Sequence, residues 1–190
     1  MTVFLLIVAI AIFVIIVMVM LPKDLSFIKG YPAGKIGGEK PRNLLAEVQQ
    51  ILGPGDKALT FTEEEVNAYI NSRIKGAQGG PLKFLVNFKG AYVDFEEGVA
   101  ESYIERTVFG IPFTMSLKLV RNRRGTEYQA GGGSIGRFSM SSRQFKPILD
   151  TFVRLSVALG EEIDAINRIE TLGQVRFEDD KLVLDPTKSN

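Results

Sequence analysis

The chain of 190 residues contains neither cysteine nor histidine. The lack of cysteine excludes a disulfide framework, a thiolate zinc site and a cysteine nucleophile. The lack of histidine removes the commonest metal ligand and the side chain that most readily exchanges protons near neutral pH. Serine hydrolysis with a histidine base, histidine-ligated zinc and haem chemistry are therefore excluded. We expect a protein that is not an enzyme and that holds no metal or cofactor.

An excess of charge of one sign is also lacking, because 23 lysines and arginines balance 22 aspartates and glutamates. Domains that bind nucleic acid are usually strongly basic. No nucleic-acid partner is therefore expected.

The chain is rich in apolar residues at its start, where no charged or polar side chain interrupts the run from Val3 to Leu21. At about 1.5 Å per residue, such a helix spans roughly 28 Å, close to the hydrocarbon core of a bilayer. A cleaved signal peptide is the alternative. Against it, no basic segment precedes the run, no small-x-small cleavage pattern follows it, and the run is longer than a usual signal core. We predict a single transmembrane anchor over residues 1–22.

The side of the membrane on which the rest of the chain lies stays open. Lysines and an arginine follow the apolar run and only the amino terminus precedes it, so the positive-inside rule favours the cytoplasm. A start codon assigned too far downstream would have removed a basic cluster from the N-terminus, and it would reverse this prediction.

Residues 23–58 are expected to form a juxtamembrane linker and a short amphipathic helix. Glycine and proline are frequent up to Lys40, as in a linker. Pro41 suits a first helical position, and Gly53 would end the helix. The apolar residues between them recur at helical spacing: Leu44, Leu45, Val48, Ile51 and Leu52. This helix should pack on the domain, with an interfacial membrane helix as the alternative.

Residues 59–186 are predicted to form one α+β domain, followed by a tail over residues 187–190. Thr62 and Glu65 have the spacing of a capping box, with Phe61 and Val66 as a hydrophobic staple. From Leu82 to Ile135 the apolar period changes to two, with turn residues at short intervals. This pattern predicts an antiparallel meander with one buried face. Charged Glu101, Glu105 and Arg106 are expected on the wet face, in cross-strand pairs.

Helices are expected to cover that sheet. A second capping-box candidate, Ser141 to Gln144, precedes an unusually apolar helix from Phe145 to Leu159. A further helix is predicted over Glu161 to Thr171, and a final hairpin pairs residues 174–177 with residues 181–184. The predicted fold is therefore α+β, in which a transmembrane helix precedes a curved antiparallel sheet packed on helices.

The glycines at 131, 133 and 136 formally match the G-x-G-x-x-G fingerprint of dinucleotide-binding proteins. That motif requires a βαβ unit with parallel strands, whereas the strands here are expected to be connected by hairpins. A glycine-kinked strand that curls the sheet is the favoured interpretation.

Apolar residues on the buried face of the sheet and on the apolar helix are the candidate lining of a ligand groove. They are Phe84, Phe88, Phe113, Met115, Leu117, Phe145, Leu149 and Phe152. A basic group at one hairpin is the candidate contact for anionic lipid headgroups, with a solvated loop as the alternative. It consists of Lys118, Arg121, Arg123 and Arg124.

Several segments resemble small membrane-anchored envelope proteins of the YpmS type. The segments are LTFTEEEVNAYINSRI, FLVNFKGAYVDFEEGVAESYIERTVFGIPFTMSLKL, GGGSIGRFSMSSRQFKPIL and QVRFEDDKLVL, between Leu59 and Leu184. Such proteins are similar to tubular lipid-binding (TULIP-like) domains, in which a long curved antiparallel sheet wraps an apolar helix. The resemblance implies association with lipid, supplies no catalytic residues, and favours a domain on the outer side of the membrane.

We therefore expect a non-enzymatic, single-pass envelope protein whose domain binds lipid or another apolar ligand. The alternative is a structural or assembly subunit of a membrane-associated complex, in which the apolar helix packs on a partner protein.

Overall fold

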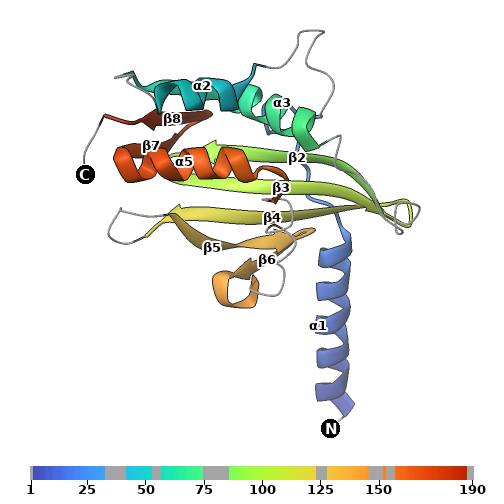
Figure 1. Cartoon of the computed structure of the whole chain (residues 1–190). Helices are drawn as coiled ribbons and strands as arrows, with labels where there is room; N and C mark the ends of the chain where they lie inside the picture. The colour runs from blue at the N-terminus through green and yellow to red at the C-terminus, as the bar shows by residue number, and fades with distance from the viewer. Residues whose placement is uncertain are drawn as a thin grey trace.

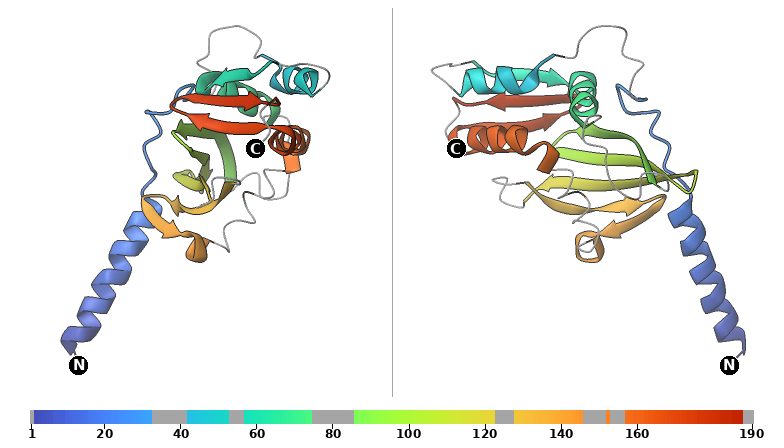
Figure 2. Two further views of the ribbon diagram at one scale, coloured as in Figure 1. Left: turned by 90° about the vertical axis from the view of Figure 1, so that its left-hand side faces the viewer. Right: turned by 45° about the vertical axis from the view of Figure 1, so that its right-hand side comes forward.

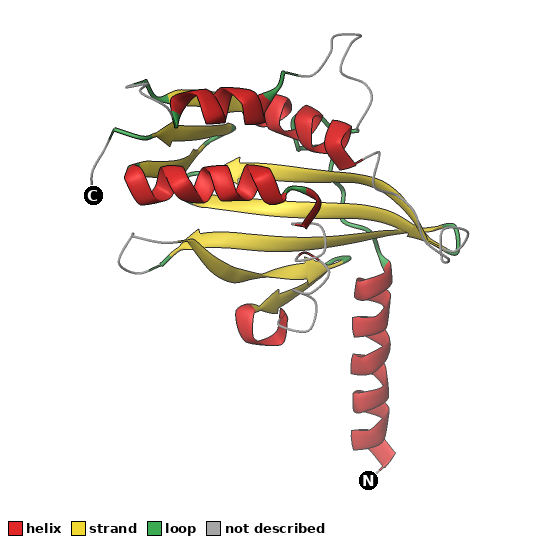
Figure 3. Cartoon of the chain, in the orientation of Figure 1, coloured by secondary structure: helices red, strands yellow, loops and turns green. Residues whose placement is uncertain are grey.

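A long helix stands apart from a domain in which helices pack against two antiparallel sheets (Figure 1). The sheets have five and three strands, and Figure 3 separates them from the helices by colour. This architecture confirms the predicted α+β class. The computed structural model describes residues 2–32, 42–52, 57–74, 86–122, 128–145, 152 and 157–187.

Helix α1 (Thr2–Met20) contains the one span in the described part of the chain that is long and apolar enough to cross a membrane. The window Val3–Met20 has a mean hydropathy of 3.6, and none of it is buried by the domain. Because the helix is apolar on all sides, no face of it is specified for packing against the domain.

The larger sheet is an antiparallel meander in chain order, as predicted. Its strands are β2 (Val86–Glu96), β3 (Val99–Val108), β4 (Ile111–Arg121), β5 (Tyr128–Ile135) and β6 (Phe138–Ser141). Strand β6, an edge strand of four residues, was not predicted. The start of the predicted alternation, at residues 82–85, lies outside the described residues.

A bulge interrupts the β4–β5 pairing at the predicted glycine kink. Leu119 pairs with Ala130 and Lys118 with Gly132, so Gly131 is left without a partner in the register. Gly132 has a φ of +129°, and a Cβ on Gly133 would collide with the carbonyl oxygen of Ser116. The neighbouring strands are antiparallel, which confirms a kinked strand in place of a dinucleotide loop.

The smaller sheet has the order β1–β8–β7, with β1 (Leu59–Thr62), β7 (Gln174–Glu178) and β8 (Lys181–Asp185). The β7–β8 hairpin was predicted and β1 was not. Helix α5 (Gly160–Leu172) packs on β7 and β8, and α2 (Leu44–Ile51) packs on α5 and shares a core cluster with this sheet. The main core forms between these layers, around Phe61, Ile169 and Leu184, each at most 1% exposed.

The capping box at the start of α3 (Glu63–Ile74) forms as predicted. Thr62 N donates to Glu65 Oε2 at 2.8 Å, and Glu65 N donates to Thr62 Oγ1 at 3.3 Å. The start of α2 differs from the prediction at Pro41, because Asn43 is the N-cap and accepts from Ala46 N at 3.3 Å. An asparagine that bonds a free backbone N–H defines a helix start more strongly than a nearby proline.

At the second predicted capping box, Ser141 N donates to Gln144 Oε1 at 3.1 Å and a helical turn follows over residues 142–145. Most of the predicted apolar helix from Phe145 to Leu159 lies outside the described residues. Phe145, Phe152 and residues 157–159 are its described parts.

The segment after α1 crosses the opposite face of the larger sheet from α5, as Figure 2 shows in its left view. On that back face, Leu25 and Ile28 are buried against Tyr92 and Tyr103. Lys23 Nζ also reaches this face and donates to the hydroxyl of Tyr103 at 2.9 Å.

Candidate functional site

Six of the eight predicted groove residues gather in one cluster on the front face of the larger sheet, the face opposite Tyr103. Their side chains come from β2, β4 and the chain after β6. Ile104 and Met115 pair across β3 and β4, and the rings of Phe145 and Phe152 lie 5.8 Å apart over them. Phe84 and Leu149 lie outside the described residues. The cluster comprises Ile104, Met115, Phe145 and Phe152 with Phe88, Phe113, Leu117 and Met140 packed around it.

A cavity of about 210 Å³, which we call the sheet cavity, lies beside this cluster. It is open between α3, the front face of β2–β4, and the chain that leads into α5. Its apolar lining includes Ile70, Ile74, Ile104, Leu117, Phe152 and Ile163. Two of the predicted groove residues, Leu117 and Phe152, therefore face open volume, and the other four in the cluster do not line the cavity.

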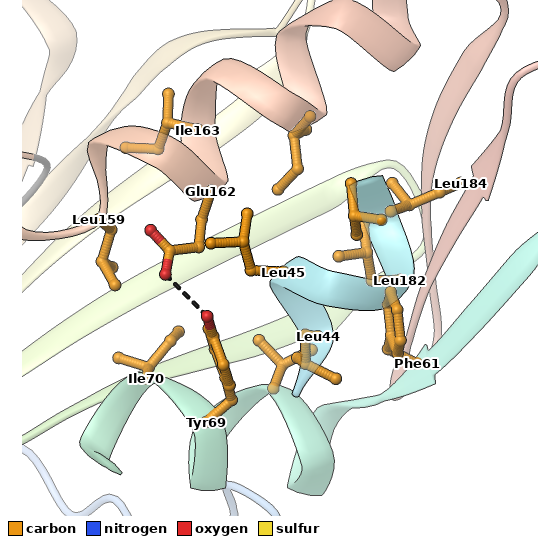
Figure 4. Close-up of a pocket in the computed structure, with 13 residues that line it drawn as sticks. Leu44, Leu45, Phe61, Tyr69, Ile70, Leu159, Glu162, Ile163, Leu182 and Leu184 are labelled. Atoms are coloured by element: carbon orange, nitrogen blue, oxygen red, sulfur yellow. Dashed lines mark hydrogen bonds between the residues drawn. The ribbon is translucent and has the colours of Figure 1, made fainter. Parts of the chain in front are cut away.

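A second cavity of about 130 Å³, the helix cavity, lies between α2, α3, α5 and β8 (Figure 4). Its lining is also almost wholly apolar and includes Leu44, Val48, Phe61, Ile166 and Leu182. The exceptions among its side chains are the carboxylate of Glu162 and the hydroxyl of Tyr69.

The two cavities adjoin, because Ile70, Leu159 and Ile163 line both. Together they form what we call the apolar groove, and their combined volume reaches the lower end of the range for ligand pockets, about 300–1,000 Å³. One of its two parts lies at the front face of the sheet, and the other lies between α2, α3, α5 and β8.

Glu162 links α3 and α5, two of the three helices that border the helix cavity. Its Oε1 accepts from the hydroxyl of Tyr69 at 2.8 Å and from Nε of Arg73 at 3.0 Å (Figure 4 shows the tyrosine bond). Burial, with the adjacent carboxylate of Glu162, raises the pKa of Tyr69 to about 12. The hydroxyl therefore stays protonated at neutral pH and holds α3 to α5 beside the groove.

The predicted headgroup residues do not form one group in the described structure. Arg121 Nη2 donates to the carbonyl of Val175 at 2.8 Å, which ties β4 to β7. Lys118 pairs in register with Glu101, whose side chain lies on the back face beside Lys23. Arg123 and Arg124 lie outside the described residues.

Sequence reasoning missed the contributions of α3 and α5 to the groove. The helical face that contains Tyr69, Ile70 and Ile74 was visible as a periodic pattern, but such a pattern does not distinguish a cavity wall from a packed core. In the described part of the chain, no group of three or more acidic side chains lies close enough to hold a metal ion.

No protein-family model, curated protein or solved structure matches the chain.

Proposed function

We propose that α1 anchors the protein in a membrane and that the domain binds a lipid or another apolar molecule in the apolar groove. The observation that carries this proposal is the pair of adjoining cavities, whose lining is mainly apolar; its polar side chains are Tyr69 and Glu162 in the helix cavity and Tyr92, Ser102 and Tyr103 in the sheet cavity. Polar specificity contributes little to such a site, and burial of apolar ligand surface supplies the binding free energy.

The attachment of α1 to the domain supports the membrane part of the proposal. Arg137 N donates to the carbonyl of Met18 at 2.9 Å, and Lys23 N donates to Thr114 Oγ1 at 2.8 Å. The β5–β6 turn therefore caps the C-terminal end of α1. Strand β4 binds the backbone of Lys23, which follows the end of α1 by three residues. With α1 in a bilayer, this end of the domain would lie at the membrane surface.

The size of the sheet cavity supports the ligand part. An apolar cavity of about 150 Å³ in another protein stays dry and binds benzene, and the sheet cavity is larger at about 210 Å³. An acyl chain that buries about 200 Å² of apolar surface would gain roughly 5 kcal/mol at 25 cal/mol per Å².

Binding of a fluorescent fatty acid to the full-length chain in a neutral detergent tests this function. We expect wild type to bind the probe and Phe152→Glu to lose binding, because a carboxylate would enter the sheet cavity. Val157→Glu is the matched control, since this nearby side chain is 78% exposed and should bind as wild type does. Ser102→Phe, which fills the same cavity without a charge, should also reduce binding.

The alternative, an assembly subunit, is favoured by apolar side chains on the outer surface near α5. Val157 is 78% exposed and Leu172 is 58% exposed. A partner protein could cover such side chains. If neither the probe nor co-purified lipid binds stoichiometrically, the groove is not a ligand site and this alternative is preferred.

A further inference from the structure

Arg106 occupies an unusual position on the apolar front face of the larger sheet. In the strand register it lies between Phe88 of β2 and Phe113 of β4. Paired residues of antiparallel strands project to the same face, so the guanidinium shares a face with these two rings. Glu105, its neighbour in the chain, points to the back face, where it accepts from the hydroxyl of Tyr31 at 3.4 Å. The predicted placement of Arg106 on the wet face with Glu101 and Glu105 is therefore wrong, because successive strand residues face opposite sides.

Arg106 has no hydrogen bond and no ion pair with the described residues. The side chain is half-buried, and burial lowers the pKa of its guanidinium. The other described arginines differ from it. Some donate to an acceptor, as Arg73 does to Glu162. Arg176 forms an ion pair with Glu178 at 3.8 Å, and Arg143 and Arg168 are exposed.

The nitrogens of this guanidinium are not among the buried, unpaired atoms of the described residues, so they stay accessible to an acceptor from outside. The guanidinium carries five N–H donors and stays charged in a protein. Removing such a charge from water is costly unless it is paired and hydrogen-bonded. Phe88 and Phe113 beside it supply no acceptor, so an anion from outside the domain is the chemically matched partner.

Arg106 does not line the sheet cavity but lies close to it along β3. Ile104, two residues earlier on the same face, lines the sheet cavity, and this step along a strand is about 7 Å. In the other direction along β3 lies the β3–β4 turn, at which Phe109 is 72% exposed and Ile111 is 48% exposed. Figures 1 and 2 place that turn near the C-terminal end of α1. The arginine thus lies between the groove and the end of the domain that α1 would hold at a membrane.

We propose that Arg106 binds the anionic headgroup, a carboxylate or phosphate, of an amphiphile whose apolar chain occupies the groove. The proposal rests on the function proposed above and specifies its ligand as an anionic lipid. The guanidinium fork would bind two oxygens of the headgroup, and the chain would pass Ile104 into the sheet cavity.

The test uses two probes with the same apolar chain, of which one has an ionised headgroup and the other a neutral headgroup larger by one methyl group. The full-length protein in a neutral detergent is titrated with a fluorescent fatty acid and with its methyl ester, at a pH where the acid is ionised. Wild type should bind the acid about 10- to 100-fold more tightly than the ester, as expected for a hydrogen-bonded charged pair. This comparison requires no variant.

Variants then assign the preference to Arg106. R106Q should reduce acid binding about 10- to 100-fold and leave ester binding unchanged, and R106K should lose less. K118Q is the matched control, because it removes a positive charge from the back face of the neighbouring strand, and it should keep the wild-type ratio. Thermal unfolding of each variant monitors folding.

Equal binding of acid and ester by wild type would overturn the assignment of the headgroup site while leaving the apolar groove intact. An unchanged ratio in folded R106Q would also overturn it, and would indicate that the charge preference arises from another part of the protein. Binding of neither probe to wild type would overturn both this proposal and the function on which it rests.

Discussion

The side-chain amide of Asn67 takes the place of a neighbouring strand at Val93. Its Nδ2 donates to the carbonyl of Val93 at 2.8 Å, and its Oδ1 accepts from the N–H of Val93 at 2.6 Å. Asn71 makes the same pair of bonds with Ala91, at 2.6 and 3.0 Å. Glu63 extends the series by accepting from Phe95 N at 2.8 Å.

The spacing of these side chains along α3 matches the spacing of their partners along β2. Four residues of helix advance about 6.0 Å, and two residues of strand advance about 6.6 Å. A side chain at every fourth position of α3 can therefore meet every second residue of β2. These backbone groups at the edge of the larger sheet therefore have hydrogen-bond partners in α3. The same bonds hold α3 where it forms one wall of the apolar groove.

Replacing Asn67 with alanine should destabilise the domain by about 2–4 kcal/mol. The substitution leaves the N–H and carbonyl of Val93 without partners, and each buried unpaired group costs about 1–3 kcal/mol. Chemical unfolding of the full-length chain in detergent measures the change. Asn167→Ala is the control, since Asn167 is exposed on α5, and it should change stability by less than about 0.5 kcal/mol. Equal effects of the two substitutions would contradict the strand-like role of Asn67.

Asp94 should make the stability of the domain depend on pH. It pairs in register with Glu101, and burial together with the charges of Glu63, Glu96 and Glu101 raises its pKa to about 6. An acid whose pKa is higher in the folded state than in the unfolded state stabilises the fold when protonated. That stabilisation is present below about pH 4 and is lost as the pH rises to about 6 and above.

Asp94→Asn should therefore stabilise the protein at pH 7 by about 1 kcal/mol, a value reduced for partial exposure to solvent. The gain over wild type should disappear by pH 4. Thermal unfolding between pH 4 and 7 measures it, and Glu97→Gln in the exposed β2–β3 turn is the control. A gain that does not vary with pH would show that the charge of Asp94 is not its cause.

Phe109 should be a source of backbone strain in the β3–β4 turn. Its φ is +51°, in the left-handed region, and its ring is 72% exposed. Asparagine adopts this region more readily, so Phe109→Asn should stabilise the domain by about 0.5–1 kcal/mol. Ile111→Asn, which removes an exposed apolar side chain without changing the turn, should not stabilise it. Denaturant midpoints compare the two, and an equal or lower midpoint for Phe109→Asn would contradict the strain.

The anchoring role of α1 predicts that the full-length chain stays with membranes through an alkaline carbonate wash. Arginine at Ile10 or Val14 should weaken insertion, at a cost of about 2.5–3.5 kcal/mol each near the bilayer centre. Phe27→Arg is the control, because Phe27 lies beyond α1 and is already exposed. Release of the wild-type chain by carbonate would contradict membrane insertion.

The parts of the fold that local pattern determines could be predicted from the sequence. The meander follows from alternation, and the start of α3 from the Thr62–Glu65 box. Strand β1 was missed because it has four residues and forms by pairing with β8, near the other end of the chain. The split into two sheets was missed for the same reason, since periodicity carries no information about which strands pair.

Only the part of the candidate site that the sheet contributes could be predicted from the sequence. Alternation identified Met115 and Leu117 as front-face residues. Asn67 and Asn71 gave no signal, because a polar residue on a helix is usually solvated. The charge of Arg106 suggests the wet face. The pleat of β3, however, points Arg106 and its neighbour Glu105 to opposite faces of the sheet.

The most direct measurement of lipid binding is native mass spectrometry of the full-length chain released from detergent, with lipid extraction from the same sample. We expect a complex of one chain with one apolar molecule, and an extracted lipid that carries an anionic headgroup. In Phe152→Glu the bound mass should be absent, and in Val157→Glu it should remain. A spectrum that contains only the mass of the bare wild-type chain, with no lipid in the extract, would contradict the proposed function.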